Sequence, residues 1–380
     1  MRVNENILIS SLTTMRLGGP ARYVIEVETP AEVADAYGFA AQFGLPTFVL
    51  GYGANTLGHD DGFNGVIIIN RMRGITKIDA TSAGDAAWGT PAASPRAVGE
   101  NAAAGPAERL IKIMGGEYWD NIVEYAVNQN LTGIEALSKI PGLAAAAPVQ
   151  NIGAYGQQIS DVLVSIDVYD SYTGTYKTLS HDDLQFSYRH SLLNTTAKGR
   201  YFVLSITLAL KPGQMPRPFY NSIERYIDDH SITDFSPQSI RNIVSTIRAD
   251  KLPDPMEKAS AGSFFHNIYL TDTEAEIAEA KGYPLHRGDD GNKLSSAWLI
   301  EQTGLKGKLL HGIRVSDKAS LVLINESAQS FSDLAKARDE IASAVYDKFG
   351  YWLKQEPVEI VNPPIKPGMY TSGPQPGVAQ

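Results

Sequence analysis

Cysteine is absent from this 380-residue chain. Its absence excludes a disulfide scaffold, thiolate metal sites, cysteine nucleophiles and cysteine-bound clusters. Basic residues are outnumbered, with 33 Lys and Arg against 42 Asp and Glu, which gives a net charge of −9. Because phosphate backbones are bound by clustered cations, this balance argues against a nucleic-acid partner. It leaves room for a single basic pocket.

Long hydrophobic runs are also missing. The longest ones, such as 66–69 and 143–149, are far shorter than the roughly 20 residues that span a membrane. The N-terminal segment 1–6 has no apolar core of signal-peptide length. We therefore expect a cytoplasmic protein with no membrane partner, long enough for two or three domains.

The first part of the chain has a β-α-β-β pattern. A strand is expected at 22–28, and Thr29 begins a helix as its N-cap, with Glu32 completing a capping box. This helix should end near Phe43, before Gly44. Strands at 47–50 and 66–70 follow, separated by a glycine-rich turn at 51–58. This order predicts a small first domain.

The remaining elements are read from periodicity and composition. Residues 80–107, rich in Ala, Gly and Pro, are expected to form a flexible loop, and the proline-rich end an extended tail. The other predictions are a helix at 117–130, strands at 162–169 and 201–211, and helices near 237–248, 294–303 and 333–349.

Two segments of small residues are candidate ligand contacts. The first, VLGYGANT at 49–56, resembles neither a dinucleotide fingerprint nor a P-loop, but its backbone N–H groups could approach a phosphate. The alternative is a tight turn with left-handed glycines. The second, 140–156, could lie flat against a planar ligand or form a packed turn between elements.

Charged and hydroxyl side chains supply further candidates. Arg189 lies between an aromatic residue and hydroxyls, where it would either stabilise an anion or be a surface cation. Ser263, between Gly262 and two aromatics, could donate a proton or simply occupy a turn; it is not a nucleophile elbow. Glu356 and Glu359 are two carboxylates near a strand end. His190 has no spacing that suits a metal site, so none is predicted.

Taken in order from Ser11 to Ile360, these segments resemble the UDP-N-acetylenolpyruvoylglucosamine reductase (UDP-N-acetylmuramate dehydrogenase, MurB) family. The resemblance is carried most specifically by APVQNIGAYG and AGSFF, with YR between them and a late Glu. The other segments are GYGANTL, VIIINRMRGI, GIEALSKIPG, FSYRHSLL, IRADKLPDP, KLSSAWLIEQTGLKG, LVLIN and WLKQEPVEI.

The resemblance implies an α+β fold, namely a two-part FAD-binding fold of the PCMH/vanillyl-alcohol-oxidase type plus a separate α+β substrate-binding domain. The boundaries expected from it are 1–70 and 71–212 for the two FAD-binding subdomains, the second carrying an insertion at 80–107, then 213–350 for the substrate domain and 363–380 for the Pro-rich tail. A strand near 352–362 is expected to return to the first subdomain.

The resemblance also implies an activity. Members of the family use FAD and NADPH to reduce UDP-N-acetylglucosamine enolpyruvate to UDP-N-acetylmuramate in peptidoglycan precursor synthesis. It further implies a small-molecule substrate, a cytoplasmic location and, as a working assumption, a monomer. The alternatives are another flavin oxidoreductase of the same fold, or a non-catalytic protein that binds flavin or a UDP-sugar.

Residue by residue, the resemblance implies that Ser263 protonates the substrate, that Arg189 stabilises the intermediate, and that Glu356 supports or orients it. The FAD-binding residues it implies are Gly51, Tyr52, Gly53, Ala54, Asn55, Thr56, Ile140, Pro141, Gly142, Gln150, Asn151, Gly153, Ala154, Tyr155 and Gly156. The substrate-binding residues are Tyr220, Arg248, Lys251, Asn267 and Lys293.

The chain departs from the family pattern in places that are expected to tune binding. Ala54 replaces a common Ser and removes one possible hydroxyl contact to FAD. The pair Ala144–Ala145 adds methyl groups that are expected to crowd the flavin. His266 stands where Lys is common, so a substrate-binding cation is expected to be missing or pH-dependent.

Overall fold

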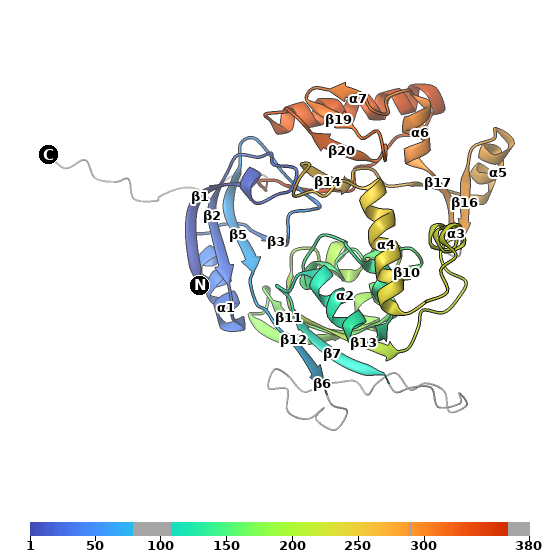
Figure 1. Ribbon diagram of the computed structural model, residues 1–380. Helices are drawn as coiled ribbons and strands as arrows, with labels where there is room; N and C mark the ends of the chain where they lie inside the picture. The colour runs from blue at the N-terminus through green and yellow to red at the C-terminus, as the bar shows by residue number, and fades with distance from the viewer. Residues whose placement is uncertain (79–107, 289–290, 364–380) are drawn as a thin grey trace.

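The structure, a computed structural model, describes residues 1–78, 108–288 and 291–363. The predicted loop at 80–107 and the predicted tail beyond Pro363 therefore lie outside the described residues. Three parts surround a common centre: a first sheet near the N-terminus, a second sheet with α2, and a C-terminal part drawn in orange and red (Figure 1). In the described residues, no helix is long and apolar enough to cross a membrane.

The first sheet has the strand order β1-β2-β5-β3, in which β2, β5 and β3 run parallel. Helix α1 (Pro30–Gln42) covers one face, because Val33 and Ala36 pack with Ile25 and Ile68. The opposite face has its own core, which includes Ile360 from the far end of the chain. The strands are β1 (Arg2–Leu8), β2 (Pro20–Val27), β3 (Thr47–Leu50) and β5 (Phe63–Asn70).

The start of α1 confirms Thr29 as N-cap, since its hydroxyl accepts a hydrogen bond from the Glu32 backbone N–H at 3.3 Å. The predicted capping box, however, does not close. The Glu32 carboxylate accepts instead from the backbone N–H of Glu28, and its other oxygen pairs with the N-terminal ammonium of Met1. An ionic partner outside the helix thus competes with the reciprocal bond to Thr29.

The second sheet is antiparallel, with the order β12-β11-β13-β7-β6 and with β8 joined to β13. Helix α2 (Trp119–Asn128) packs Ile122 and Ala126 onto it, as the amphipathic pattern predicts. Edge strand β6 pairs directly with β7, Ile78 opposite Leu110. The strands are β6 (Ile75–Ile78), β7 (Arg109–Met114), β8 (Leu131–Thr132), β11 (Leu163–Asp170), β12 (Thr175–Ser180) and β13 (Tyr201–Pro212); a small hairpin of β9 (Gly153–Ala154) and β10 (Gln157–Gln158) lies apart.

The C-terminal part contains two small antiparallel sheets, β14-β20-β19-β18 and β15-β17-β16. Helices α6 (Ser296–Gln302) and α7 (Phe331–Phe349) enclose a core that includes Phe264, Phe265 and Ile341. The other elements are β14 (Ser260–Ser263), β15 (Ile268–Leu270), α5 (Asp272–Ala280), β16 (Leu285–Gly288), β17 (Gly291–Leu294), β18 (Leu309–Leu310), β19 (Ile313–Val315) and β20 (Val322–Asn325).

Helices α3 (Asn221–His230) and α4 (Pro237–Lys251) pack on the second part, in a core that includes Ala136 and partly buried Tyr155. Arg241 of α4 is 6% exposed and forms a two-pronged ion pair with Asp120 of α2, at 2.6 and 3.0 Å. The helix then runs toward β14, so its C-terminal end lies between the second and C-terminal parts (Figure 1).

The chain returns to its beginning at the end of the C-terminal part. The predicted glycine-rich turn contains a short strand, β4 (Thr56–Gly58), which pairs in parallel with β21 (Val358–Ile360). Sequence reasoning did not predict β4, because three residues that include a glycine carry no strand periodicity. This pairing brings the segment that contains Glu356 close to the glycine loop after β3.

Candidate active site

The glycine loop after β3 is packed backbone to backbone. Gly53 has a φ of +73°, and a Cβ added to it would lie 2.2 Å from the carbonyl oxygen of Leu12. The Gly53 carbonyl also accepts a hydrogen bond from the backbone N–H of Thr14 at 3.1 Å. Only glycine combines this conformation with this close approach, so the loop is held against the segment 12–14.

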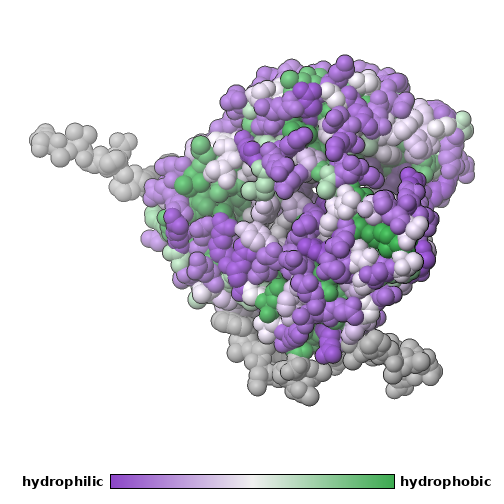
Figure 2. Space-filling model, viewed as in Figure 1, coloured by the Kyte–Doolittle hydropathy of each residue, from purple (hydrophilic) through white to green (hydrophobic). Residues whose placement is uncertain are grey.

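The second predicted segment, 140–156, faces this loop. A Cβ on Gly51 would lie 3.5 Å from that of Ala146, and the Asn55 amide donates to the Gln150 amide oxygen at 3.0 Å. Next to the loop, a cleft of about 410 Å³ opens between the parts. It is lined by Ser10, Ser11, Leu12, Thr13, Thr14, Arg16, Leu50, Gly51, Tyr52, Ile69, Arg71, Tyr118, Leu143, Pro255 and Met256. Figure 2 shows a hollow near the centre of the molecule, lined with residues of intermediate hydropathy.

The structure changes the interpretation of the Ala144–Ala145 departure. Ala144 is fully buried in the core of the second part, and Ala145 packs against the same core. The Ala144 methyl group therefore fills protein interior, Ala145 is half-buried, and Ala146 faces Gly51. Crowding of the flavin by this pair stays a prediction.

Arg189 is anchored to the second loop. Its guanidinium donates to the carbonyl oxygens of Asn151 at 3.3 Å and Gly153 at 2.8 Å, while its own backbone has a φ of +54°. Asn151 and Tyr155 also adopt left-handed backbone conformations. Such conformations in non-glycine residues gather at functional sites. Arg189 is therefore held at the loop and is not a free surface cation.

Ser263 lies at the end of β14 and is exposed. Its strand is bonded to the segment 12–14, which packs against the glycine loop: the Ser260 N–H donates to the Thr14 carbonyl at 3.1 Å, and the Thr14 hydroxyl donates back to the Ser260 carbonyl at 2.5 Å. Gly262, with a φ of +70°, has open space where a side chain would project. Thr14, which sequence reasoning missed, therefore links the glycine loop to the strand of Ser263.

Glu356 is placed beside that strand by backbone pairing. Its N–H donates to the Phe264 carbonyl at 2.9 Å, and the His266 N–H donates to the Lys354 carbonyl at 2.9 Å. The carboxylate then lies 3.6 Å from His266 Nδ1. Burial raises the pKa of Glu356, and the nearby Arg189 acts in the opposite direction.

His266 behaves differently from a lysine at the same place. Burial lowers its pKa, and the cations of Arg189 and Lys354 and the neighbouring His190 lower it further. Because the ordinary value is 6.5, the ring is mostly uncharged at neutral pH. Of the two expectations for this departure, a missing cation and a pH-dependent one, the structure favours the missing cation at neutral pH.

Two of the predicted substrate-binding residues make contacts with aromatic rings. Tyr220 contacts Tyr155 edge-on, with ring centroids 5.9 Å apart, and the Lys293 ammonium lies 3.9 Å from the ring centre of Tyr188. Burial raises the pKa of Tyr155, while Arg248 beside it acts in the opposite direction.

The remaining two substrate-binding candidates lie in different surroundings. Lys251 is exposed at the end of α4. Asn267 instead accepts a hydrogen bond from the Ser296 N–H at 3.2 Å, which uses its oxygen to support the start of α6. No group of His, Asp and Glu side chains suited to a metal ion occurs within the part of the chain that the structure describes.

Comparison with known proteins agrees with this arrangement. Residues 254–360 match the C-terminal domain of UDP-N-acetylenolpyruvoylglucosamine reductase, and residues 21–180 match an FAD binding domain. The reductase of Ralstonia nicotianae is 34% identical over 351 residues, which cover 91% of this chain and 96% of that protein. This chain belongs to the UDP-N-acetylenolpyruvoylglucosamine reductase family.

Other members of the reductase family support the assignment. The reductase of Escherichia coli K12 is 30% identical over 341 residues, 88% of this chain and 90% of that protein. The crystal structure of the enzyme from Thermus caldophilus covers 94% of this chain and 99% of its own, with a TM-score of 0.61 and 21% identity. The fold is thus an FAD-binding fold of the PCMH/vanillyl-alcohol-oxidase type with a separate C-terminal domain, as predicted.

The residues at the cleft fit a flavin dinucleotide. Gly51 lines the cleft just past the end of β3, where a backbone N–H with no side chain beside it can approach a pyrophosphate. Ser10, Ser11, Thr13 and Arg71 line the same cleft, and the last three bond to the Leu8 carbonyl, the Ile9 carbonyl and the Glu26 carboxylate. A glycine at a strand end beside polar residues suits the pyrophosphate of FAD.

Proposed function

We propose that this chain reduces UDP-N-acetylglucosamine enolpyruvate to UDP-N-acetylmuramate with FAD and NADPH, as a step in peptidoglycan precursor synthesis. One observation carries the proposal: Arg189 lies close enough to Glu356 to influence its pKa, and Glu356 is bonded to Phe264, the residue after Ser263. We also propose that the enzyme works in the cytoplasm as a monomer, without a nucleic-acid or membrane partner.

The reaction needs a hydride at C3 of the enolpyruvyl group and a proton at C2. FAD, when bound, supplies the hydride. Ser263 is proposed to supply the proton, since its hydroxyl is exposed next to a glycine that leaves open space. Thr14, which lines the cleft, bonds to Ser260 on the same strand, three residues before Ser263.

Negative charge develops on the substrate carboxylate and C2 when hydride arrives. Arg189 is proposed to stabilise this charge, because two backbone carbonyls hold its guanidinium in place. Glu356 is proposed to orient the same region. Burial raises the pKa of Glu356 and lowers that of His266, so Arg189 is the cation proposed to face the anionic substrate here.

The UDP group needs cations. Arg248 and Lys251 at the end of α4, with Lys293 and Tyr220, are proposed to contact the diphosphate and nearby substrate atoms. Asn267 would contribute its amide N–H groups, since its oxygen is already used by Ser296. We retain the boundaries 1–70, 71–212 and 213–350 as a proposal. In the structure, α3 and α4 pack on the second part and not in the C-terminal core.

The test is spectroscopic. Purified protein is expected to show flavin absorbance, to lose it on addition of NADPH without oxygen, and to regain it when UDP-N-acetylglucosamine enolpyruvate is added. NADH, tested in parallel, determines the choice of reductant. A flavin-containing protein that NADPH reduces but the enolpyruvyl sugar does not reoxidise would contradict the proposed substrate, and a screen of other acceptors would follow.

A further inference from the structure

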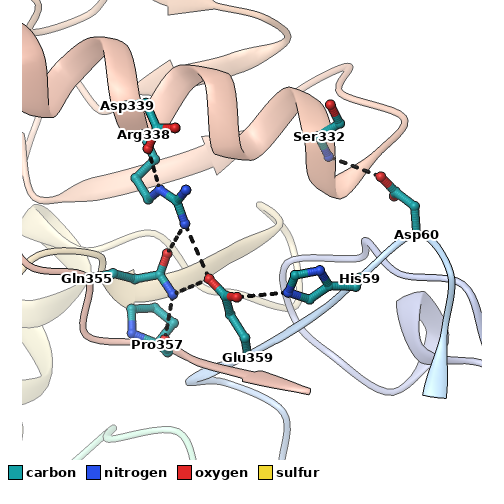
Figure 3. Close-up of polar contacts among 8 residues, drawn as sticks. All are labelled: His59, Asp60, Ser332, Arg338, Asp339, Gln355, Pro357 and Glu359. Carbon is teal, nitrogen blue, oxygen red and sulfur yellow. Dashed lines mark hydrogen bonds and ion pairs between the residues drawn. The ribbon is translucent and has the colours of Figure 1, made fainter. Parts of the chain in front are cut away.

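A group of side chains makes hydrogen bonds to the two residues that flank Glu356, Gln355 and Pro357 (Figure 3). Gln355 makes the first contacts: its amide oxygen accepts from the Arg338 guanidinium at 3.1 Å, and its amide nitrogen donates to the Pro357 carbonyl at 2.8 Å. These bonds reach the residues on both sides of Glu356. The bend at Gln355–Pro357 is therefore closed by a side chain as well as by the proline ring.

Glu359 extends this group toward the first part of the molecule (Figure 3). One carboxylate oxygen accepts from Gln355 at 3.0 Å and from Arg338 at 3.2 Å, and the other lies 2.8 Å from His59 Nε2. The His59 ring stacks on Phe331 at the start of α7, with centroids 3.9 Å apart. The group therefore joins α7, β21 and the loop after β4.

The same loop fixes α7 at its N-terminus. Asp60 accepts hydrogen bonds from the backbone N–H groups of Phe331 at 2.6 Å and Ser332 at 3.1 Å. A carboxylate at this position satisfies N–H groups that have no partner inside the helix and complements its dipole. Arg338 projects from a helix whose start is anchored in this way, and its hydrogen bonds to Gln355 and Glu359 fix the guanidinium.

Consecutive side chains of an extended segment point to opposite sides. Gln355 contacts α7, whereas the Glu356 carboxylate lies near His266 and Arg189. We propose that Arg338, Gln355 and Glu359, braced by His59, are positioning residues that set the location of the Glu356 carboxylate in the reaction. This inference rests on the proposed role of Glu356.

The proposed effect acts through geometry and not through contact with substrate. A misplacement of about 1 Å at a reacting centre can cost on the order of 100-fold in rate. Arg338 and Glu359 are each about three-quarters buried, with 26% of the side chain exposed. Loss of one member therefore leaves partly buried polar groups without their partners, and the bend is expected to relax.

The test compares Arg338→Gln and Gln355→Leu with a matched control, Arg314→Gln. Arg314 also forms a two-pronged pair with a carboxylate, that of Glu326, in the same part of the chain, and is 34% exposed. In the flavin-loaded enzyme, R338Q and Q355L are expected to slow flavin reoxidation by UDP-N-acetylglucosamine enolpyruvate roughly tenfold in kcat. Flavin reduction by NADPH and the substrate KM should stay within about twofold. R314Q should change neither rate.

A double-mutant cycle separates positioning from a general structural role. In a Glu356→Gln background, R338Q should produce no further loss of reoxidation rate, because its effect passes through Glu356. R338K should restore part of the rate, since it keeps the charge with one contact in place of two. Thermal unfolding midpoints of R338Q and R314Q provide the readout that is independent of activity, and similar decreases are expected.

Additive effects of R338Q and E356Q would overturn the positioning role. So would equal losses in both half-reactions, or a reoxidation rate of R338Q and Q355L that matches wild type. If E356Q itself reoxidises at the wild-type rate, the proposed role of Glu356 fails and the inference fails with it. Wild-type protein that ignores the enolpyruvyl sugar identifies a failure of the proposed function instead.

Discussion

The two walls of the candidate active site are built by opposite means. The flavin wall consists of backbone and small residues, with Gly53 pressed against Leu12 and Gly51 opposite Ala146. The substrate wall consists of charged and hydroxyl side chains placed by hydrogen bonds between distant residues, as Arg189 is by the Gly153 carbonyl and Gln355 is by Arg338. Changes in the first wall should therefore alter whether the cofactor binds, and changes in the second should alter one chemical step.

The largest effect is expected on the substrate wall, for Ser263→Ala. Removal of the proton donor should slow flavin reoxidation by the enolpyruvyl sugar by about 100-fold or more, because general acid catalysis commonly contributes that much. Flavin reduction by NADPH should be nearly unchanged. Stopped-flow absorbance of each half-reaction measures both, and a similar decrease in the two would contradict the proposed role.

The flavin wall is tested by Gly53→Ala against Gly44→Ala. Both glycines have positive φ, but a Cβ on Gly44 meets no atom within 4 Å, whereas one on Gly53 meets the Leu12 carbonyl. Both variants bear the backbone strain, of about 1 kcal/mol or more. Only G53A should also lose FAD, and with it both half-reactions, as measured by flavin content after purification. Equal flavin content in the two variants would show that the close packing is not needed for binding.

A stability prediction concerns the junction of α2 and α4. Burial alone would raise the pKa of Asp120, but hydrogen bonds from Arg241 and Lys139 hold that pKa well below its usual range. Asp120→Asn leaves Arg241 without its charge partner and should lower the free energy of unfolding by about 2–3 kcal/mol at neutral pH.

The sign of its pH dependence follows from the lowered pKa. A carboxylate with a depressed pKa contributes stability above its unfolded value of 3.8, and this is lost as the pH falls through the folded value. The difference between wild type and D120N should therefore shrink in acid. Asp182→Asn is the control, because that side chain is 91% exposed, and its curve should follow wild type.

The smallest effect is expected for the stability of Glu356→Gln. Because burial raises the pKa of Glu356, its contribution to stability is present below the ordinary value of 4.5 and is lost as the pH rises through the folded value. E356Q should therefore match or slightly exceed wild type in unfolding midpoint at pH 8, and the two should converge in acid. A lower midpoint for E356Q at pH 8 would contradict this.

Sequence reasoning predicted the elements whose patterns lie within a few neighbouring residues. Thr29 caps α1, and the apolar faces of α2 and α7 follow helical periodicity. It missed the edge strand β1, whose residues are mostly polar and exposed, and the helices α3 and α5, which are short. Strand and helix patterns are weak when few residues are buried.

In the candidate site, too, sequence reasoning found the residues with local signals and missed the long-range contacts. Motifs named Arg189, Ser263 and Glu356, but no pattern along the chain indicates that Thr14 would bond the strand of Ser263, or that Asn55 would meet Gln150. The pairing of Gln355 with Arg338 is equally invisible. Such contacts join residues far apart in sequence, so they depend on the completed fold and not on local propensity.

The pairing of β4 with β21 has a consequence for how the protein is made. His59 and Glu359 form a contact across 300 residues, and Ile360 completes the core on one face of the first sheet. Domains usually fold from the N-terminus as the chain emerges from the ribosome. Here the core on one face of the first sheet includes a residue from near the end of the described chain, so we expect part of that face to stay exposed until synthesis is almost finished. Contacts of this separation also slow folding.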